Sequence, residues 1–125
     1  MVESILDSIK ELLGINSEDT SFDKELIIYI NSALMIASQL GVGPTSGYSI
    51  TDKSNIWTTF TLGRTDLEAI KTDIYLRVRL IFDPPQNSFL VALIKEQIQE
   101  YDWRISVNTT PVTVVDPITD PTIYE

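Results

Sequence analysis

The chain contains neither histidine nor cysteine, so carboxylates and hydroxyls are the main groups left for acid–base or nucleophilic chemistry. Without those two residue types, Ser-His-Asp and Cys-His nucleophile systems cannot be built. Zinc sites that use His or Cys ligands are excluded for the same reason. A carboxylate-dependent enzyme would need paired acids in one cleft, and the spacing of the acids indicates none. The sequence therefore predicts a protein that is not an enzyme and holds no cofactor or metal.

The densest group of acids lies in "SEDTSFDKE", residues 17–25. A calcium loop needs acids or amides at alternating positions and a glycine at its turn, and this segment has neither. The glycines of "GVG", residues 41–43, lack the lysine and the preceding strand of a phosphate-binding loop. We interpret the acids as helix-capping residues and find no catalytic constellation.

The charge balance is strongly acidic, with 18 acidic and nine basic residues and a net charge of −9. Binding to a phosphate backbone through counterion release needs clustered lysine and arginine. Here the basic residues are spread thinly, which predicts no sequence-specific nucleic-acid binding. An acidic surface is compatible with DNA that passes close by without adhering.

Length and composition indicate one soluble domain with no disulfide. The chain has 125 residues, and its first residues, "MVESILDSIKELL", carry acids where a signal peptide needs basic residues. No apolar run reaches membrane-spanning length. We expect a protein that is neither exported by a signal peptide nor inserted in a membrane.

The apolar spacing predicts two helices in the first third of the chain. The first covers about residues 2–13 and is followed by Gly14 at the position of a C-terminal cap. The second covers about residues 22–40, with Ser17 or Thr20 as its expected N-cap. Apolar residues occur on nearly every side of the second helix, which predicts that it is buried all round. It is then either the central helix or one partly covered by a neighbouring subunit.

Two longer helices are predicted after residue 65. The third, about 66–82, begins with a Thr65–Glu68 capping box, and its expected buried stripe is Leu67, Ile70, Ile74, Val78 and Ile81. The fourth starts near Asn87 or Ser88 and runs to about 105, with an apolar side made of Phe89, Leu90, Leu93, Ile94, Ile98 and Tyr101. The short joint "FDPPQNS" between them favours an antiparallel pair. Favourable pairs four positions apart are expected within these helices at Asp73–Arg77 and Glu100–Arg104.

The loop 41–63 is long for a connection inside a compact domain and is rich in aromatic residues. Two interpretations stay open for its large side chains. They cover the helical core, or some of them face a partner, since tyrosine and tryptophan are favoured at interfaces. The candidates for partner binding are Tyr48, Ile50, Trp57 and Phe60.

The last segment, residues 107–125, is predicted to be an arm that does not continue the helix. It holds three prolines and no basic residue, while valine, isoleucine and tyrosine recur in it. Fully extended, it would reach roughly 60 Å, far past a body whose radius of gyration is about 13 Å. Prolines lower the entropy lost on docking, and "PVTVV" partly alternates like a strand that adds to a sheet edge. We expect the arm to dock on a neighbouring subunit or partner through Val112, Val114, Val115, Ile118, Ile123 and Tyr124.

These expectations give an all-α fold. Residues 1–106 form a small four-helix bundle with a long aromatic loop, and residues 107–125 form an extended C-terminal arm.

The succession of segments resembles the head–tail connector, or adaptor, proteins of long-tailed double-stranded-DNA bacteriophages. The resemblance covers most of residues 4–105 and rests on "ILDSIKELLGI", "SALMIASQLGVGP", "WTTF", "DLEAIKTDIYLRVRLIFDPP" and "SFLVALIKEQIQEYDWRI". It implies a helical bundle and a structural role in the virion neck, after assembly in the host bacterial cytoplasm. It also implies a homo-oligomeric ring of about twelve copies below the portal protein, which continues the DNA channel and carries a stopper or tail-completion protein.

A second hypothesis remains beside this one. The chain would be a soluble helical module, an assembly chaperone or regulator, that binds one partner through loop 41–63 and is not retained in the virion.

Overall fold

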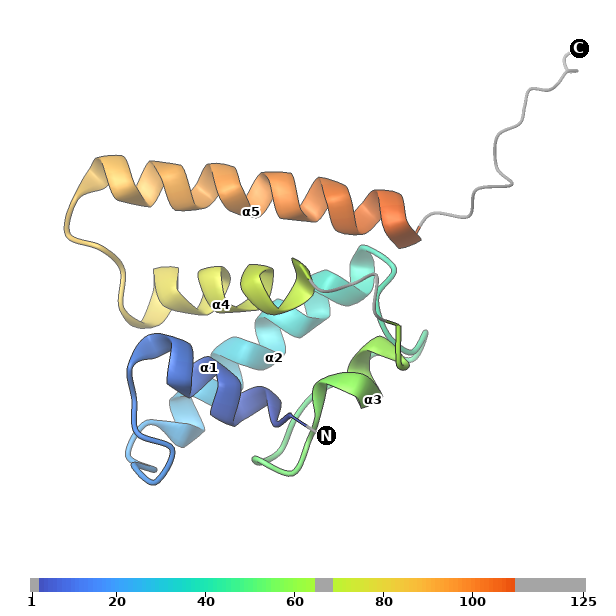
Figure 1. Ribbon diagram of the computed structural model, residues 1–125, viewed down its shortest axis with the longest axis horizontal. Coiled ribbons are helices and arrows are strands. Elements are labelled where there is room, and N and C mark those ends of the chain that lie inside the picture. The colour runs from blue at the N-terminus through green and yellow to red at the C-terminus, as the bar shows by residue number, and fades with distance from the viewer. Residues whose placement is uncertain (1–2, 65–68, 110–125) are drawn as a thin grey trace, which may run out of the picture.

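The computed structural model describes residues 3–64 and 69–109, which form five helices (Figure 1). They are α1 (Ile5–Leu13), α2 (Asp23–Gln39), α3 (Trp57–Thr61), α4 (Ala69–Phe82) and α5 (Ser88–Thr109). Over these ranges the only β-type pairing is one isolated bridge between Ser4 and Ile56. The predicted all-α fold is confirmed.

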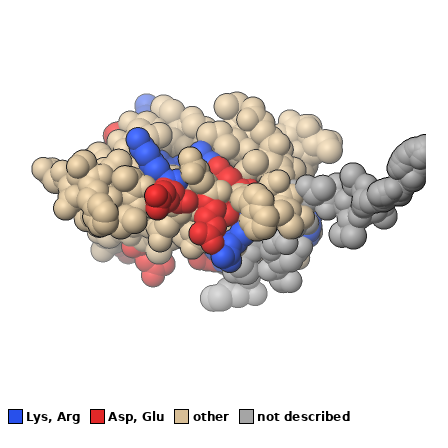
Figure 2. All heavy atoms as spheres, turned by 90° about the horizontal axis from the view of Figure 1, so that it is seen from above, with Lys and Arg blue, Asp and Glu red and all other residues tan. Residues whose placement is uncertain are grey.

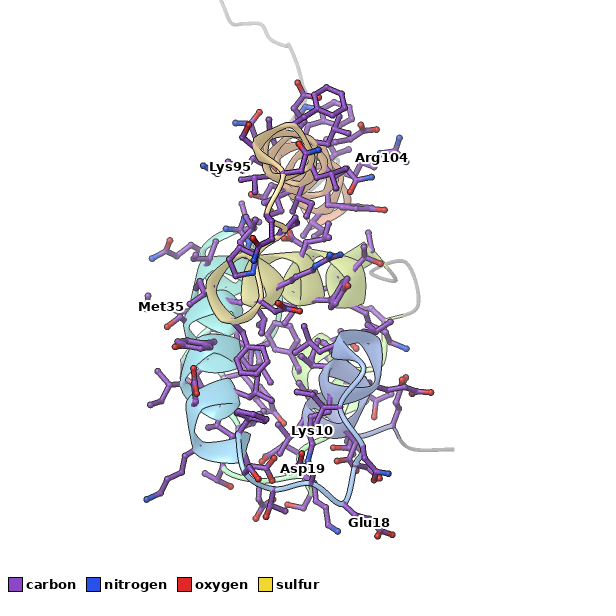
Figure 3. The ribbon with its side chains drawn as sticks, turned by 90° about the vertical axis from the view of Figure 1, so that its left-hand side faces the viewer. Lys10, Glu18, Asp19, Met35, Lys95 and Arg104 are labelled. Atoms are coloured by element: carbon purple, nitrogen blue, oxygen red, sulfur yellow. The ribbon has the colours of Figure 1, made fainter. Side chains whose placement is uncertain are left out.

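The helices lie in three tiers, with α4 in the middle. α5 runs antiparallel to α4 along one side of it, as the short proline-containing joint predicts, and α1 and α2 pack on the other side (Figures 1 and 3). α5 is therefore the outermost helix, and it packs mainly against α4.

The main core lies between α1, α2, α4 and the loop that carries α3. Its fully buried side chains are contributed by every one of these elements, including Ile9, Leu26, Phe60 and Ile74. A smaller cluster, made of Leu76, Ile94 and Ile98, joins α4 to α5. Since this second cluster is small, the α4–α5 contact also depends on polar side chains.

The caps agree with the sequence at some helix ends and not at others. Gly14 ends α1 with a φ of 83°, a left-handed conformation that favours glycine. The Asn87 side chain accepts a hydrogen bond from the backbone N–H of Phe89 (2.7 Å) at the start of α5. The expected side-chain cap of α2 at Ser17 or Thr20 is wrong, because the residue before the helix is Phe22, which makes no capping bond.

Several sequence predictions about the long helices need correction or fall outside the described residues. α5 continues to Thr109, past the predicted boundary at 106, because the first proline of the final segment is at position 111. The described residues do not bury α2 all round, since Ile28 and Met35 are exposed, which leaves the predicted alternative that a neighbouring subunit partly covers this helix. The predicted burial of Ile81 is wrong, because its side chain is 56% exposed. The capping box Thr65–Glu68 and Leu67 lie outside the described residues.

The short helix α3 is missing from the sequence prediction. Its sequence, "WTTFT", spans only five residues and consists of aromatic and threonine side chains with modest helix propensity. The helix forms because Trp57 and Phe60 are pulled into the core, so tertiary packing and not local preference stabilises it.

Candidate interaction surfaces

The predicted partner-binding residues of loop 41–63 lie mostly in the core of the chain. Ile50, Trp57 and Phe60 are buried, and Tyr48 is half-buried. The indole Nε1 of Trp57 donates a hydrogen bond to the Ser8 hydroxyl at 2.7 Å, and the rings of Tyr48 and Phe60 are in contact. The geometry favours the interpretation in which this loop covers the helical core.

The same loop is fastened to α2 by one amide side chain. Asn31 accepts a hydrogen bond from the backbone N–H of Ile50 (2.7 Å) and donates one to its carbonyl (3.1 Å). Farther along, Gly43 has a φ of 86°, and a Cβ there would lie 2.9 Å from Phe60. These contacts hold the loop against the bundle, and the large apolar side chain that it leaves exposed is Leu62, at 63%.

The remaining six predicted contact residues lie outside the described part of the chain. They are Val112, Val114, Val115, Ile118, Ile123 and Tyr124. Their role in docking stays a prediction.

A different apolar surface, on the outside of α5, is exposed. We call it the outer α5 face and define it by Phe89, Leu93, Glu96, Glu100, Trp103 and Val107, which the helical period places on one side. Phe89 and Trp103 are 67% and 66% exposed, and Val107 and Leu93 are 50% and 40% exposed. Figure 2 views the molecule from the side on which α5 lies, and uncharged atoms dominate that view, with a few acidic and basic groups across its middle. Exposed apolar side chains gathered on one helix face are a feature of interaction surfaces.

A second exposed apolar strip lies on α2. We call it the outer α2 face and define it by Lys24, Ile28, Ser32, Met35 and Gln39. Ile28 and Met35 are 63% and 57% exposed, and Figure 3 shows Met35 pointing away from the bundle. This face is on another tier of the molecule from the outer α5 face.

The sequence itself indicates the outer α5 face, but this is missed when all apolar residues of the helix are assigned to one buried side. Phe89, Leu90 and Leu93 were predicted to share one buried side with Ile94 and Ile98, and this is wrong, because the first three are exposed. At 100° per residue, Phe89 and Leu93 lie opposite Ile98. A helix with apolar residues on two opposite sides indicates two contact surfaces.

A buried charge cluster joins α4 to α5. The Arg77 Nε donates to Asp73 at 2.9 Å, and the Arg77 guanidinium also pairs with Asp102 of α5. Burial and a hydrogen bond with Asp102 raise the pKa of Asp73 to about 8, against the opposing charge of Arg77. Burial acts to lower the pKa of Arg77, but the hydrogen bonds and charges of the two acids outweigh it and raise that pKa.

This arrangement puts two carboxylates beside one cation. The contact between Arg77 and Asp73 confirms the predicted pair within α4. The exposed pair Glu100–Arg104 is also confirmed, with a distance of 2.5 Å between the charged atoms. The Asp102 Oδ1 atom is buried and makes no hydrogen bond to a donor among the described residues. With Asp73 in the protonated form that its raised pKa favours, the cluster holds one cation and one carboxylate, which suits a structural joint between helices.

A second buried cation fixes the connection between α1 and α2. Lys10 is 1% exposed, and its Nζ contacts the Asp23 carboxylate at 2.9 Å and the Ser17 carbonyl at 3.1 Å. Asp23, interpreted from the sequence as a first-turn acid, thus also serves as the partner of a buried charge. Two other acids of residues 17–25 make local hydrogen bonds: Asp19 accepts from the backbone N–H of Ser21, and Glu25 accepts from the Tyr29 hydroxyl.

The hollows in the described part of the chain are lined mainly by polar side chains. An open hollow beside α1 is lined by Glu3, Asp7 and Glu11 and by no basic side chain. Over residues 3–64 and 69–109, no three potential metal-ligating side chains come together. In the same ranges, none of the helices has the length and hydropathy needed to cross a membrane.

Comparison with known proteins adds the identity of the family. A family profile described as "Phage connector protein" matches residues 5–112, which include all five helices. No significant match was found among curated proteins or among solved structures. The match extends over far more than half of the chain, through the bundle and beyond the end of α5. The chain therefore belongs to the phage connector protein family, a family of structural components of phage particles.

Proposed function

We propose that this protein forms a ring of about twelve copies below the portal, where it joins the DNA-filled head to the tail and continues the DNA channel. Membership of the connector family over residues 5–112 is the observation that carries this proposal. Portal symmetry sets the copy number, and a cyclic ring is the closed form of a head-to-tail assembly.

The surface of the chain supports an assembly role. A cyclic ring needs two different patches on each subunit, one for each neighbour. The outer α5 face and the outer α2 face are two such patches, each with large exposed apolar side chains. A protein that worked alone would leave these side chains in water at a cost to its solubility.

The charge of the chain supports a position around DNA. The net charge of −9 repels a phosphate backbone, and no cluster of basic residues is available to hold it. DNA that moves through a channel lined by such subunits meets no strong binding site, so the channel lets the DNA pass without holding it.

Electron microscopy of purified portal particles with and without this protein tests the proposal. We expect added ring density on one side of the portal, with the symmetry of the portal. Portal particles that show no added density, together with a chain that stays monomeric at high concentration, would contradict it. A soluble complex with one partner, absent from finished particles, would instead support an assembly chaperone.

A further inference from the structure

We propose that neighbouring copies join by packing the outer α5 face of one subunit in parallel against the outer α2 face of the next, with Glu96 opposite Lys24. This inference rests on the proposed ring and names the surfaces that close it. The occupant of the α5 face is thus a second copy of the chain.

The apolar content of the two faces requires a covering partner. α5 already buries Ile94, Ile98 and Ile105 on its inner side, and its opposite side exposes Phe89, Trp103 and Val107. α2 likewise buries one side and exposes Ile28 and Met35. The α5 and α2 patches lie on different tiers, so the two patches of one subunit cannot contact each other (Figure 3). When two copies meet, the α5 patch of one subunit can cover the α2 patch of the other.

The charges on the two faces are complementary. Glu96 and Glu100 lie in the middle of the outer α5 face, and Glu100 is already paired with Arg104. Glu96 and Lys24 are both exposed and make no ion pair with another described residue. A contact between two α5 faces would bring the acids of one copy against those of the other, which disfavours that pairing.

The spacing along the helices sets the register and the direction. Lys24 and Met35 are eleven positions apart, and so are Glu96 and Val107, which corresponds to about 16 Å along each axis. With Glu96 at Lys24 and the helices parallel, Val107 meets Met35.

The same register brings Trp103 against α2. Trp103 falls between Ile28 and Met35, as a side chain does when it fills the gap between two residues of a facing helix. At the other end, Leu93 lies level with position 21 and Phe89 with position 17, both before the first residue of α2, so Phe89 stays outside this helix contact. The antiparallel alternative would carry Met35 beyond the start of α5 and leave Trp103 and Val107 uncovered.

Cysteine cross-linking tests this contact directly, because the natural chain has no cysteine. Full-length Lys24→Cys and Glu96→Cys proteins are prepared separately, then mixed and treated with a short bismaleimide, both alone and with portal particles. We expect a cross-linked dimer in the mixture and none in either variant by itself. A mixture of Leu12→Cys and Glu96→Cys is the matched control, since Leu12 is exposed on α1, a helix that carries neither face.

Charge reversal gives a second readout that does not depend on the reagent. Lys24→Glu and Glu96→Lys each put like charges together and should weaken self-association about tenfold or more, while the double variant should restore most of it. Both positions are exposed, so neither change disturbs the fold.

Three other outcomes would contradict the inference. Cross-linking of Glu96→Cys with itself would show a symmetric α5–α5 contact. Loss of association that the double variant fails to restore would show that another surface covers these faces. Ring density on the portal without the Lys24–Glu96 cross-link would refute this register and direction while leaving the proposed function intact.

Discussion

Asp73 shows how strongly the interior of this small bundle changes a single ionisable group. Its carboxylate is 2% exposed and shares the cation of Arg77 with Asp102. Burial and the neighbouring acid raise its pKa from 3.8 to about 8. Between these values the folded protein holds a proton that the unfolded chain has released, so the free energy of unfolding falls as the pH rises. Below about pH 4 both states are protonated, and this dependence disappears.

Asp73→Asn is expected to remove that pH dependence. Asparagine keeps the shape of the protonated acid, accepts from Arg77 and donates to Asp102, and it does not titrate. The stability of the variant relative to the natural protein should therefore increase between about pH 5 and about pH 8, by at most about 1.4 kcal/mol per pH unit. Urea denaturation across this range measures it, with the exposed Glu18→Gln as the control. A difference that stays constant with pH would show that Asp73 is ionised in the folded protein.

Ser8→Ala is expected to destabilise the fold by about 1–3 kcal/mol, because it leaves the buried indole N–H of Trp57 without an acceptor. The control Ser46→Ala removes an exposed loop hydroxyl and should have almost no effect. Equilibrium denaturation gives both values. In a Trp57→Phe background the cost of Ser8→Ala should shrink, and an unchanged cost would attribute the effect to packing and not to this hydrogen bond.

At the scale of elements, the loop between α2 and α3 is an ordered layer held by a few contacts. Asn31 satisfies both backbone groups of Ile50, and Gly43 lets the backbone approach Phe60 closely. The burial of Ile50 follows from these contacts as much as from its own hydrophobicity.

Asn31→Ala should release this loop locally without unfolding the helices. The backbone N–H of Ile50 loses its acceptor, and we expect its hydrogen exchange to become at least about tenfold faster. Asn87→Ala is the matched control, because this asparagine accepts its hydrogen bonds from Phe89 and Leu90 at the start of α5. Unchanged exchange at Ile50 would indicate that packing alone holds the loop.

The positions of the long helices were largely predictable from the sequence. Which side of each helix is buried and which is exposed was not. Apolar periodicity located four helices, and the paired prolines located the turn before α5. Sequence periodicity shows which residues are apolar, but it cannot show whether a neighbour within the chain covers them, so Ile81 and Leu93 were misplaced. For the loop, the sequence left two roles open, because a tryptophan such as Trp57 suits an interface as well as a core. Its hydrogen bond to Ser8, which only the structure shows, favours the core.

At the scale of the whole molecule, the chain has a well-packed inner half and an outer half that exposes apolar surface. The inner half, around α1, α2 and α4, is sealed by the loop that carries α3. The outer half consists of α5, held by a small cluster and by the Asp73–Arg77–Asp102 charges. Among the described residues nothing covers the apolar side chains on the far side of α5 and on α2, and the proposed assembly would bury them. This division of surfaces suits a subunit of a larger structure.

The copy number of the protein in purified phage particles tests the central claim most directly. Quantitative mass spectrometry against isotope-labelled peptides gives the ratio of this chain to the portal protein. A ring that matches the portal predicts about twelve copies per particle and a ratio close to one. Finished particles that contain the portal and lack this chain would contradict the account.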